Sequence, residues 1–184
     1  EPYRYMMGSD GAGGMGLGRM FTDDLTSGST SEAMEFWVDN GGGPEWSDTL
    51  ANPVQLFSPG NSETHIQYEP AWGLYFTMVY NPFTPTIYLT TAPELTGPWS
   101  DPVCIYDVPE HEAVSFDIIS YAVRPHPELS TQTGELVISY ATNAFGEPLG
   151  TLLGEEGSEI YYPRFIRLQL ELNDSIPVSL AGFT

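Results

Sequence analysis

Glu63 and His65 are residues whose types and spacing could support acid–base chemistry. They lead into the strand-like run 66–68, in which alternate side chains share a face, so His65 is expected on the same face as Gln67. A carboxylate at the start of a strand can act as a general acid or bind substrate, and His65 can hydrogen-bond a substrate. The alternatives are an exposed loop glutamate and a structural histidine. Asp117, before another strand-like run, is a further candidate catalytic carboxylate.

A second cluster is Arg124-Pro125-His126-Pro127-Glu128. The two prolines stiffen the backbone and hold His126 in a defined direction, which suits a preorganised site. His126 is therefore a candidate catalytic residue, with Arg124 and Glu128 as candidate substrate-binding residues. The alternative is a turn whose histidine caps backbone groups and whose glutamate is solvated.

A third cluster places Tyr162 close to Arg164. Arginine is scarce in this chain, so a guanidinium beside aromatic rings predicts a substrate-binding position. The alternative is a structural ion pair with a carboxylate, which a strongly negative protein would stabilise well.

Tryptophans provide candidates for stacking on sugar faces. Trp37 and Trp72 lie near turns and are the more open candidates, Trp72 especially. Trp46 and Trp99 each precede Ser-Asp, and this repeated tripeptide predicts equivalent packing positions in two structural units.

The charge of the chain excludes several classes of partner. It has 184 residues with 25 acidic and five basic side chains, for a net charge of -20. Such a surface repels nucleic-acid phosphates and anionic membranes. One cysteine and three histidines give no zinc-binding spacing, and we expect no cofactor, although a structural cation in an acidic channel is compatible with the sequence. The glycine-rich run 11–18 lacks the Lys-Ser/Thr of a phosphate-binding loop.

Several features predict a secreted, extracellular protein. The chain opens on Glu1-Pro2 and runs almost at once into a strand, as a processed or partial chain would. Asn173 begins a glycosylation acceptor pattern, and no apolar run is long enough to span a membrane. The lone Cys104 is either a small buried apolar residue or half of a bridge to another segment.

The elements that must position these residues are short strands between glycine and proline turns, without a persistent helical pattern. The predicted strands are 3–7, 15–21, 34–38, 64–68, 74–80, 86–91, 103–106, 119–124, 136–142 and 160–170. They form a loose repeat of small antiparallel sheets, which favours the blades of a β-propeller over a sandwich. About three blades fit in residues 1–184, treated as a single propeller domain. A closed propeller needs at least four, so we expect a missing N-terminal segment or a second chain to complete the ring.

The segments THIQYEPAWGLYFTMVY (64–80) and IYLTTAPELTGPWSDPVCIYD (87–107) resemble a unit of five-bladed glycoside-hydrolase-like propellers. The segments GLGRMFTDDLTSG, VRPHPELSTQTGELVISYATN and YYPRFIRLQL follow the same order. The closest resemblance is to family 4185 of domains of unknown function, some of whose relatives are endo-D-arabinanases. It implies that the His126 corner faces the channel and that this chain matches the C-terminal part of the family domain. A first blade, which commonly supplies the base or nucleophile, is then absent.

Two functions remain open at this stage. One is a secreted glycoside hydrolase or relative that acts on a polysaccharide. The other is a non-catalytic propeller that binds glycan or assembles an extracellular layer. Two facing carboxylates about 5–10 Å apart would favour hydrolysis, whereas one or none, with aromatic rings at the mouth, would favour binding.

Overall fold

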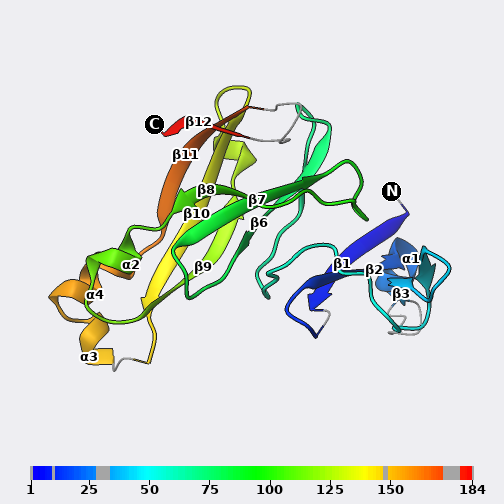
Figure 1. Cartoon of the computed structure of the whole chain (residues 1–184), viewed down its shortest axis with the longest axis horizontal. Helices are drawn as coiled ribbons and strands as arrows, with labels where there is room; N and C mark the ends of the chain where they lie inside the picture. Colours follow the sequence, from blue (N-terminus) through cyan, green and yellow to red (C-terminus); the bar gives the residue numbers. More distant parts are fainter. Residues whose placement is uncertain (1, 10, 28–33, 147–148, 172–178, 184) are drawn as a thin grey trace.

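Three four-stranded antiparallel sheets follow one another in chain order through the computed structural model (Figure 1). The structure describes residues 2–9, 11–27, 34–146, 149–171 and 179–183. Strands that are neighbours in sequence are also neighbours in each sheet, as expected for antiparallel strands joined by turns. The all-β prediction is therefore confirmed.

The first sheet has the order β1-β2-β3-β4. Its strands are β1 (Tyr3–Ser9), β2 (Met15–Phe21), β3 (Met34–Asp39) and β4 (Pro44–Ser47), and helix α1 (Thr22–Ser27) follows β2. The long connection to the next sheet returns along β2, where Leu56 donates its N–H to the carbonyl of Met15 at 2.8 Å. This connection covers the buried side of the glycine-rich strand β2.

The second and third sheets carry most of the core. The second consists of β5 (Gln67–Glu69), β6 (Leu74–Tyr80), β7 (Thr86–Ala92) and β8 (Val103–Asp107). The third, in the order β12-β11-β10-β9, consists of β9 (Ile118–Pro125), β10 (Glu135–Ala144), β11 (Arg164–Glu171) and β12 (Ser179–Phe183). The connections contain helices α2 (Glu110–Ala113), α3 (Leu149–Leu152) and α4 (Glu155–Ile160) and the 3-10 turn η2 (Pro127–Leu129).

The middle sheet is buried on both faces, because β6 contributes side chains to two separate cores. Phe76, Met78 and Tyr80 pack toward the third sheet, with Ile138 and Leu168. Val79 packs instead toward the first sheet; this second core also contains Met15, Leu17, Leu56 and Phe57. Because neighbouring side chains of β6 point into different cores, the second sheet lies between the first and the third.

Several predicted elements differ from the structure for identifiable reasons. The predicted strand 160–170 begins only at Arg164, because the residues up to Ile160 form helix α4. The predicted strand 64–68 pairs only over Gln67–Glu69. Trp46 lies on β4, whereas Trp99 lies in the loop before β8, so their positions are not equivalent; both nevertheless pack on the core between the first two sheets. The acceptor pattern at Asn173 falls outside the described residues.

Candidate functional site

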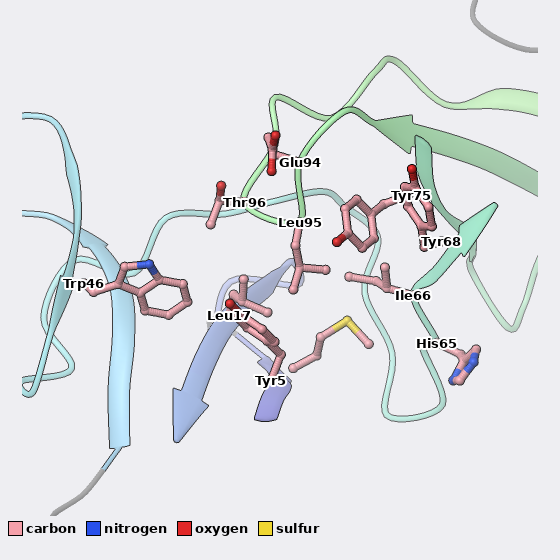
Figure 2. Close-up of a pocket in the computed structure, with 11 residues that line it drawn as sticks. Tyr5, Leu17, Trp46, His65, Ile66, Tyr68, Tyr75, Glu94, Leu95 and Thr96 are labelled. Carbon is pink, nitrogen blue, oxygen red and sulfur yellow. The ribbon is translucent and has the colours of Figure 1, made fainter. Parts of the chain in front are cut away.

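A groove with a volume of about 610 Å³ lies between the first two sheets. Four aromatic side chains line it: Tyr5 of β1, Trp46 of β4, Tyr68 of β5 and Tyr75 of β6 (Figure 2). The other lining residues are apolar (Met7, Leu17, Ile66 and Leu95) or polar (His65, Glu94 and Thr96). Its volume and its mixture of rings with a few polar groups are those of a small-molecule site.

Strand register brings the aromatic rings of the groove together. Tyr68 stands directly opposite Tyr75 across β5 and β6, and their ring centroids are 5.0 Å apart. Tyr5 stands opposite Arg19 across β1 and β2. The two outermost rings, those of Tyr5 and Tyr68, remain 40% and 48% exposed, so each presents ring surface to a ligand.

Arg19 fixes the orientation of Trp46. Its guanidinium lies 4.2 Å from the ring centroids of both Tyr3 and Trp46, and its Nε is 2.7 Å from an oxygen of Glu35. A guanidinium stacked on an indole face attracts the ring electrostatically. Trp46, predicted from sequence to be a packing residue, therefore packs on one side and lines the groove on another.

The loop that carries Glu94 closes one side of the groove. The N–H of Gly97 donates to the carbonyl of Glu94 at 2.9 Å, and the indole N–H of Trp99 donates to the carbonyl of Leu95 at 3.3 Å. Gly97 has a φ of 95°, a conformation that favours glycine at this turn. The loop is thereby held against the groove by its own hydrogen bonds.

Glu63, two residues before the groove-lining His65, is bound to the third sheet. Its Oε2 accepts the backbone N–H of Ala122 at 2.6 Å and the hydroxyl of Tyr80 at 3.4 Å. Ala122 has a φ of 52°, which is strained for a residue with a side chain. Burial, and then the charge of Glu63, raise the pKa of Tyr80 to about 12. These contacts give Glu63 a positioning role for β9; its predicted role as a general acid remains a prediction.

His65 lines the groove, and Figure 2 places it at the opposite end from Trp46. Burial, followed by the nearby charge of Arg124, lowers the pKa of His65. His65 is therefore a neutral hydrogen-bonding group at neutral pH.

Asp117 is exposed just before β9, five residues before Ala122, whose N–H Glu63 accepts. Its predicted catalytic role remains a prediction.

His126 is held within its turn by both ring nitrogens. Nδ1 lies 2.9 Å from an oxygen of Glu128, and Nε2 lies 2.8 Å from the hydroxyl of Ser139. The hydrogen bond to His126 lowers the pKa of Glu128. Both partners of His126 are side chains and not the backbone groups of the predicted cap, whereas the exposure of Glu128 agrees with a solvated turn residue. The catalytic role of His126 and the substrate-binding role of Glu128 remain predictions.

Arg164 forms the structural ion pair that the sequence left open. Its Nε pairs with Glu110, and its guanidinium lies 4.2 Å from the ring centroid of Tyr162. Glu110 is buried and also accepts the hydroxyl of Tyr140 at 3.0 Å. Trp72, predicted to be open, is half-buried and packs on the core, with its ring 5.4 Å from that of Phe76, and its substrate-binding role remains a prediction.

Sequence reasoning missed the residues that dominate the groove. Tyr5, Tyr68, Tyr75 and Glu94 were not singled out, although Tyr5 and Tyr68 lie on short strands whose pairing leaves one side exposed. In the part of the chain that the structure describes, three or more His, Cys, Asp or Glu residues nowhere gather as metal ligands. The same residues include no helix with the length and apolar character to cross a membrane.

Comparison with solved structures shows a related fold. A crystal structure of a "putative hydrolase" from Bacteroides ovatus matches with a TM-score of 0.66 and 19% identity, over 90% of this chain and 41% of that one. The chain thus spans less than half the length of that protein. 1,3Gal43A, an exo-β-1,3-galactanase from Clostridium thermocellum, matches over 96% of this chain and 33% of its own length. Its TM-score of 0.36 and identity of 10% are too low to support an argument.

Sequence comparisons identify the family. No curated protein matches this chain. The resemblance to family 4185 is not confirmed, since the matching family model is a different one and covers residues 1–170. The chain therefore belongs to the family described as Domain of unknown function (DUF5005).

Proposed function

We propose that this chain is the glycan-binding part of a secreted, glycoside-hydrolase-like protein that acts on a polysaccharide. The observation that carries the proposal is the groove of about 610 Å³ lined by Tyr5, Trp46, Tyr68 and Tyr75. Aromatic faces pack against the C–H faces of sugar rings, while a few polar groups bind their hydroxyls. His65, Glu94 and Thr96 are such polar groups.

The hydrolase part of the proposal is supported by the fold. The similarity to the Bacteroides ovatus structure extends over most of this chain but less than half of that protein. We propose that the three sheets are blades of a five-bladed propeller. A further segment or a second chain would then supply the remaining blades.

Glycoside hydrolysis requires two carboxylates, and the residues that line this groove provide one. Among the residues that line it, Glu94 is the single carboxylate, and glycosidases use two. We therefore propose that this chain binds glycan and that the second carboxylate comes from the rest of the ring. The same observation favours the alternative, a non-catalytic glycan-binding or assembly protein of an extracellular layer.

Binding can be measured by isothermal titration calorimetry with a panel of soluble polysaccharides that includes arabinan and galactan. Each of Tyr5→Ala and Tyr68→Ala should weaken binding several-fold, because an aromatic contact contributes ~0.5–1.5 kcal/mol. Tyr162→Ala is the matched control: Tyr162 has a similar exposed fraction, 42%, but lies beside Arg164 at the α4 end of the molecule (Figure 1). Equal losses in all three variants, or none in the two groove variants, would refute the groove as the site.

A retained affinity does not establish cleavage, so hydrolysis needs a separate assay. Reducing-end release from the polysaccharide that binds should be absent for residues 1–184 alone. It should appear only when the remaining blades are supplied. Release by this chain alone, abolished by Glu63→Gln, would instead place Glu63 in the mechanism.

A further inference from the structure

A glutamate, a histidine and a serine are linked by hydrogen bonds on the third sheet. Nδ1 of His126 lies 2.9 Å from an oxygen of Glu128, and Nε2 of the same ring lies 2.8 Å from the hydroxyl of Ser139. His126 follows the end of β9, Glu128 lies in the turn η2, and Ser139 lies on β10. A carboxylate on one ring nitrogen and a hydroxyl on the other is the arrangement of the orienting group, base and nucleophile of serine hydrolases.

The charge of Glu128 determines which nitrogen of His126 carries the proton. The hydrogen bond to His126 lowers the pKa of Glu128, so this carboxyl is ionised at neutral pH and can only accept hydrogen bonds. In the neutral ring, Nδ1 must therefore donate to Glu128, which leaves Nε2 without a proton. The hydroxyl of Ser139 then donates to Nε2, as a nucleophile does to its general base.

The backbone holds the His126 ring in place without a ligand. Pro125 and Pro127 flank this residue and restrict the chain on both sides. The N–H of His126 donates to the carbonyl of Val137 at 2.8 Å, and its carbonyl accepts the N–H of Leu129 at 3.0 Å. A base whose backbone is fixed in this way is preorganised for proton transfer.

The hydroxyl of Ser139 lies on the open face of the third sheet. Its neighbours along β10, Ile138 and Tyr140, are buried in the core, so the Ser139 side chain points to the opposite face. Strand register places Arg124 of β9 and Phe165 of β11 directly opposite Ser139, one on each side. Arg124 is exposed and Phe165 is 57% exposed. A substrate at Ser139 therefore meets a cation on one side and an apolar ring on the other.

These groups favour a neutral ester as the substrate. The net charge of -20 repels anionic substrates such as phosphate esters. The ring of Phe165 can contact a short acyl chain, and the charge of Arg124 can stabilise the oxyanion that forms at the carbonyl.

The reaction at this site needs only an ester and water. The Ser139 oxygen bonds to the carbonyl carbon while its proton moves to Nε2 of His126. The bond between that carbon and the alcohol oxygen then breaks, and His126 returns the proton to the departing alcohol. Water attacks the acyl-serine by the same route, which releases a carboxylic acid and restores the hydroxyl of Ser139.

We infer that Ser139, His126 and Glu128 form an active site that hydrolyses short acyl esters. Ser139 is its nucleophile and His126 its general base, whereas Glu128 is a positioning residue that acts through His126. The inference goes beyond the proposed function and does not rest on it, because this site lies on the third sheet and the glycan-binding groove lies between the first two.

A fluorophosphonate probe tests the nucleophile directly, because attack of the Ser139 oxygen on phosphorus expels fluoride and passes the proton to His126. Residues 1–184 should gain the mass of one phosphonyl group, and peptide mapping should place it on Ser139. Ser139→Ala should abolish labelling, and His126→Gln should slow it by about 100-fold or more. Labelling should persist when the remaining blades are supplied.

Ser120 provides the matched control within the same chain. Its hydroxyl lies 2.9 Å from Nε2 of His111, but Ser120 is 1% exposed and closed to a probe. Ser120→Ala should therefore leave the labelling rate unchanged. Release of p-nitrophenol from p-nitrophenyl acetate measures turnover; Arg124→Gln should slow it roughly tenfold, because an oxyanion donor open to water contributes less than a buried one.

The role of Glu128 can be separated from a merely structural contact. Glu128→Gln should slow the release of p-nitrophenol, and nitrogen-15 NMR should show a smaller fraction of the His126 ring protonated at Nδ1. An unchanged tautomer with an unchanged rate would remove Glu128 from the site.

Several outcomes would overturn the inference. They are an absence of labelling, a label on another residue, labelling that survives Ser139→Ala, and labelling that is lost when the remaining blades are present. Labelling by the fluorophosphonate without release of p-nitrophenol would overturn the assignment to acyl esters. None of these outcomes bears on glycan binding, which Tyr5→Ala and Tyr68→Ala test separately.

Discussion

Replacing Glu63 with alanine should destabilise the fold, because this carboxylate joins the segment before β5 to a strained position on β9. Its Oε2 accepts the N–H of Ala122 at 2.6 Å, and Ala122 has a φ of 52°. Without Glu63, the Ala122 N–H loses its charged acceptor. The positive φ then loses the contact that holds it, so β9 is free to relax.

The magnitude follows from the two hydrogen bonds. A hydrogen bond to a charged group contributes about 1.5–3 kcal/mol, and the short distance to Ala122 places this one in that range. The Tyr80 hydroxyl, at 3.4 Å, is beyond the usual O–H···O distance and contributes little. We therefore expect Glu63→Ala to lower the free energy of unfolding by about 2–3 kcal/mol. For a chain of this size, that loss corresponds to a decrease in Tm of about 4–12 °C.

Urea unfolding monitored by tryptophan fluorescence measures this loss, with Glu63→Gln as the matched control. The glutamine oxygen can still accept the Ala122 N–H, so this variant should lose only about half as much. A Glu63→Ala variant whose stability stays within ~0.5 kcal/mol of the unmodified chain would show that the contact does not support β9. Equal, large losses in both variants would show that charge, and not the hydrogen bond, is responsible.

Three further perturbations test the packing and the electrostatics. Arg164→Ala removes the cation that pairs with Glu110, which is 4% exposed, and should cost about 3–5 kcal/mol in urea unfolding. Burial lowers the pKa of both His65 and His111 below 6.5, so the folded protein binds protons at these rings less readily than the unfolded chain does. The stability that the two neutral rings contribute is therefore present above about pH 6.5 and is lost as the pH falls through their lowered folded-state pKa values. The free energy of unfolding of the double His→Gln variant should therefore fall less steeply between pH 7 and 5, and an unchanged slope would contradict this. Gly134→Ala should destabilise by roughly 1–3 kcal/mol, because φ is 79° and an added Cβ would lie 2.7 Å from a backbone oxygen; a variant as stable as the parent would contradict the local geometry.

The sequence predicted several strands well because runs rich in apolar residues lie between clear turn residues. The strands 15–21 and 74–80 match β2 and β6 residue for residue. Strand β4 was missed because it begins at Pro44 after three glycines, a composition that is typical of a turn. A proline is tolerated here because β4 lies at the edge of its sheet. Helices as short as α4 escape detection because one or two turns establish no period.

The site was harder to predict than the strands, because exposure depends on how the sheets stack. An aromatic residue on a strand looks the same in sequence whether it packs in a core or lines a groove. Trp46 and Trp99 share the same following dipeptide, yet only Trp46 lines the groove. His126 and Arg164 were predicted as site residues because of their side-chain types and neighbours. In the structure, the His126 ring hydrogen-bonds Glu128 and Ser139, and Arg164 pairs with Glu110.

The two cores also bear on how a ligand in the groove would affect the protein. Among the described residues, thirteen buried side chains form the core between the second and third sheets, whereas five buried and seven half-buried side chains form the core between the first and second. The first sheet therefore has fewer fully buried apolar side chains to hold it in place. The groove is built across this weaker junction, with Tyr5 and Trp46 on one side and Tyr68 and Tyr75 on the other. A glycan that contacts both sides of the groove would stabilise the contact between the first and second sheets by its binding free energy. Local opening of the first sheet would separate the two halves of the site, so occupancy of the groove and attachment of the first sheet are thermodynamically linked.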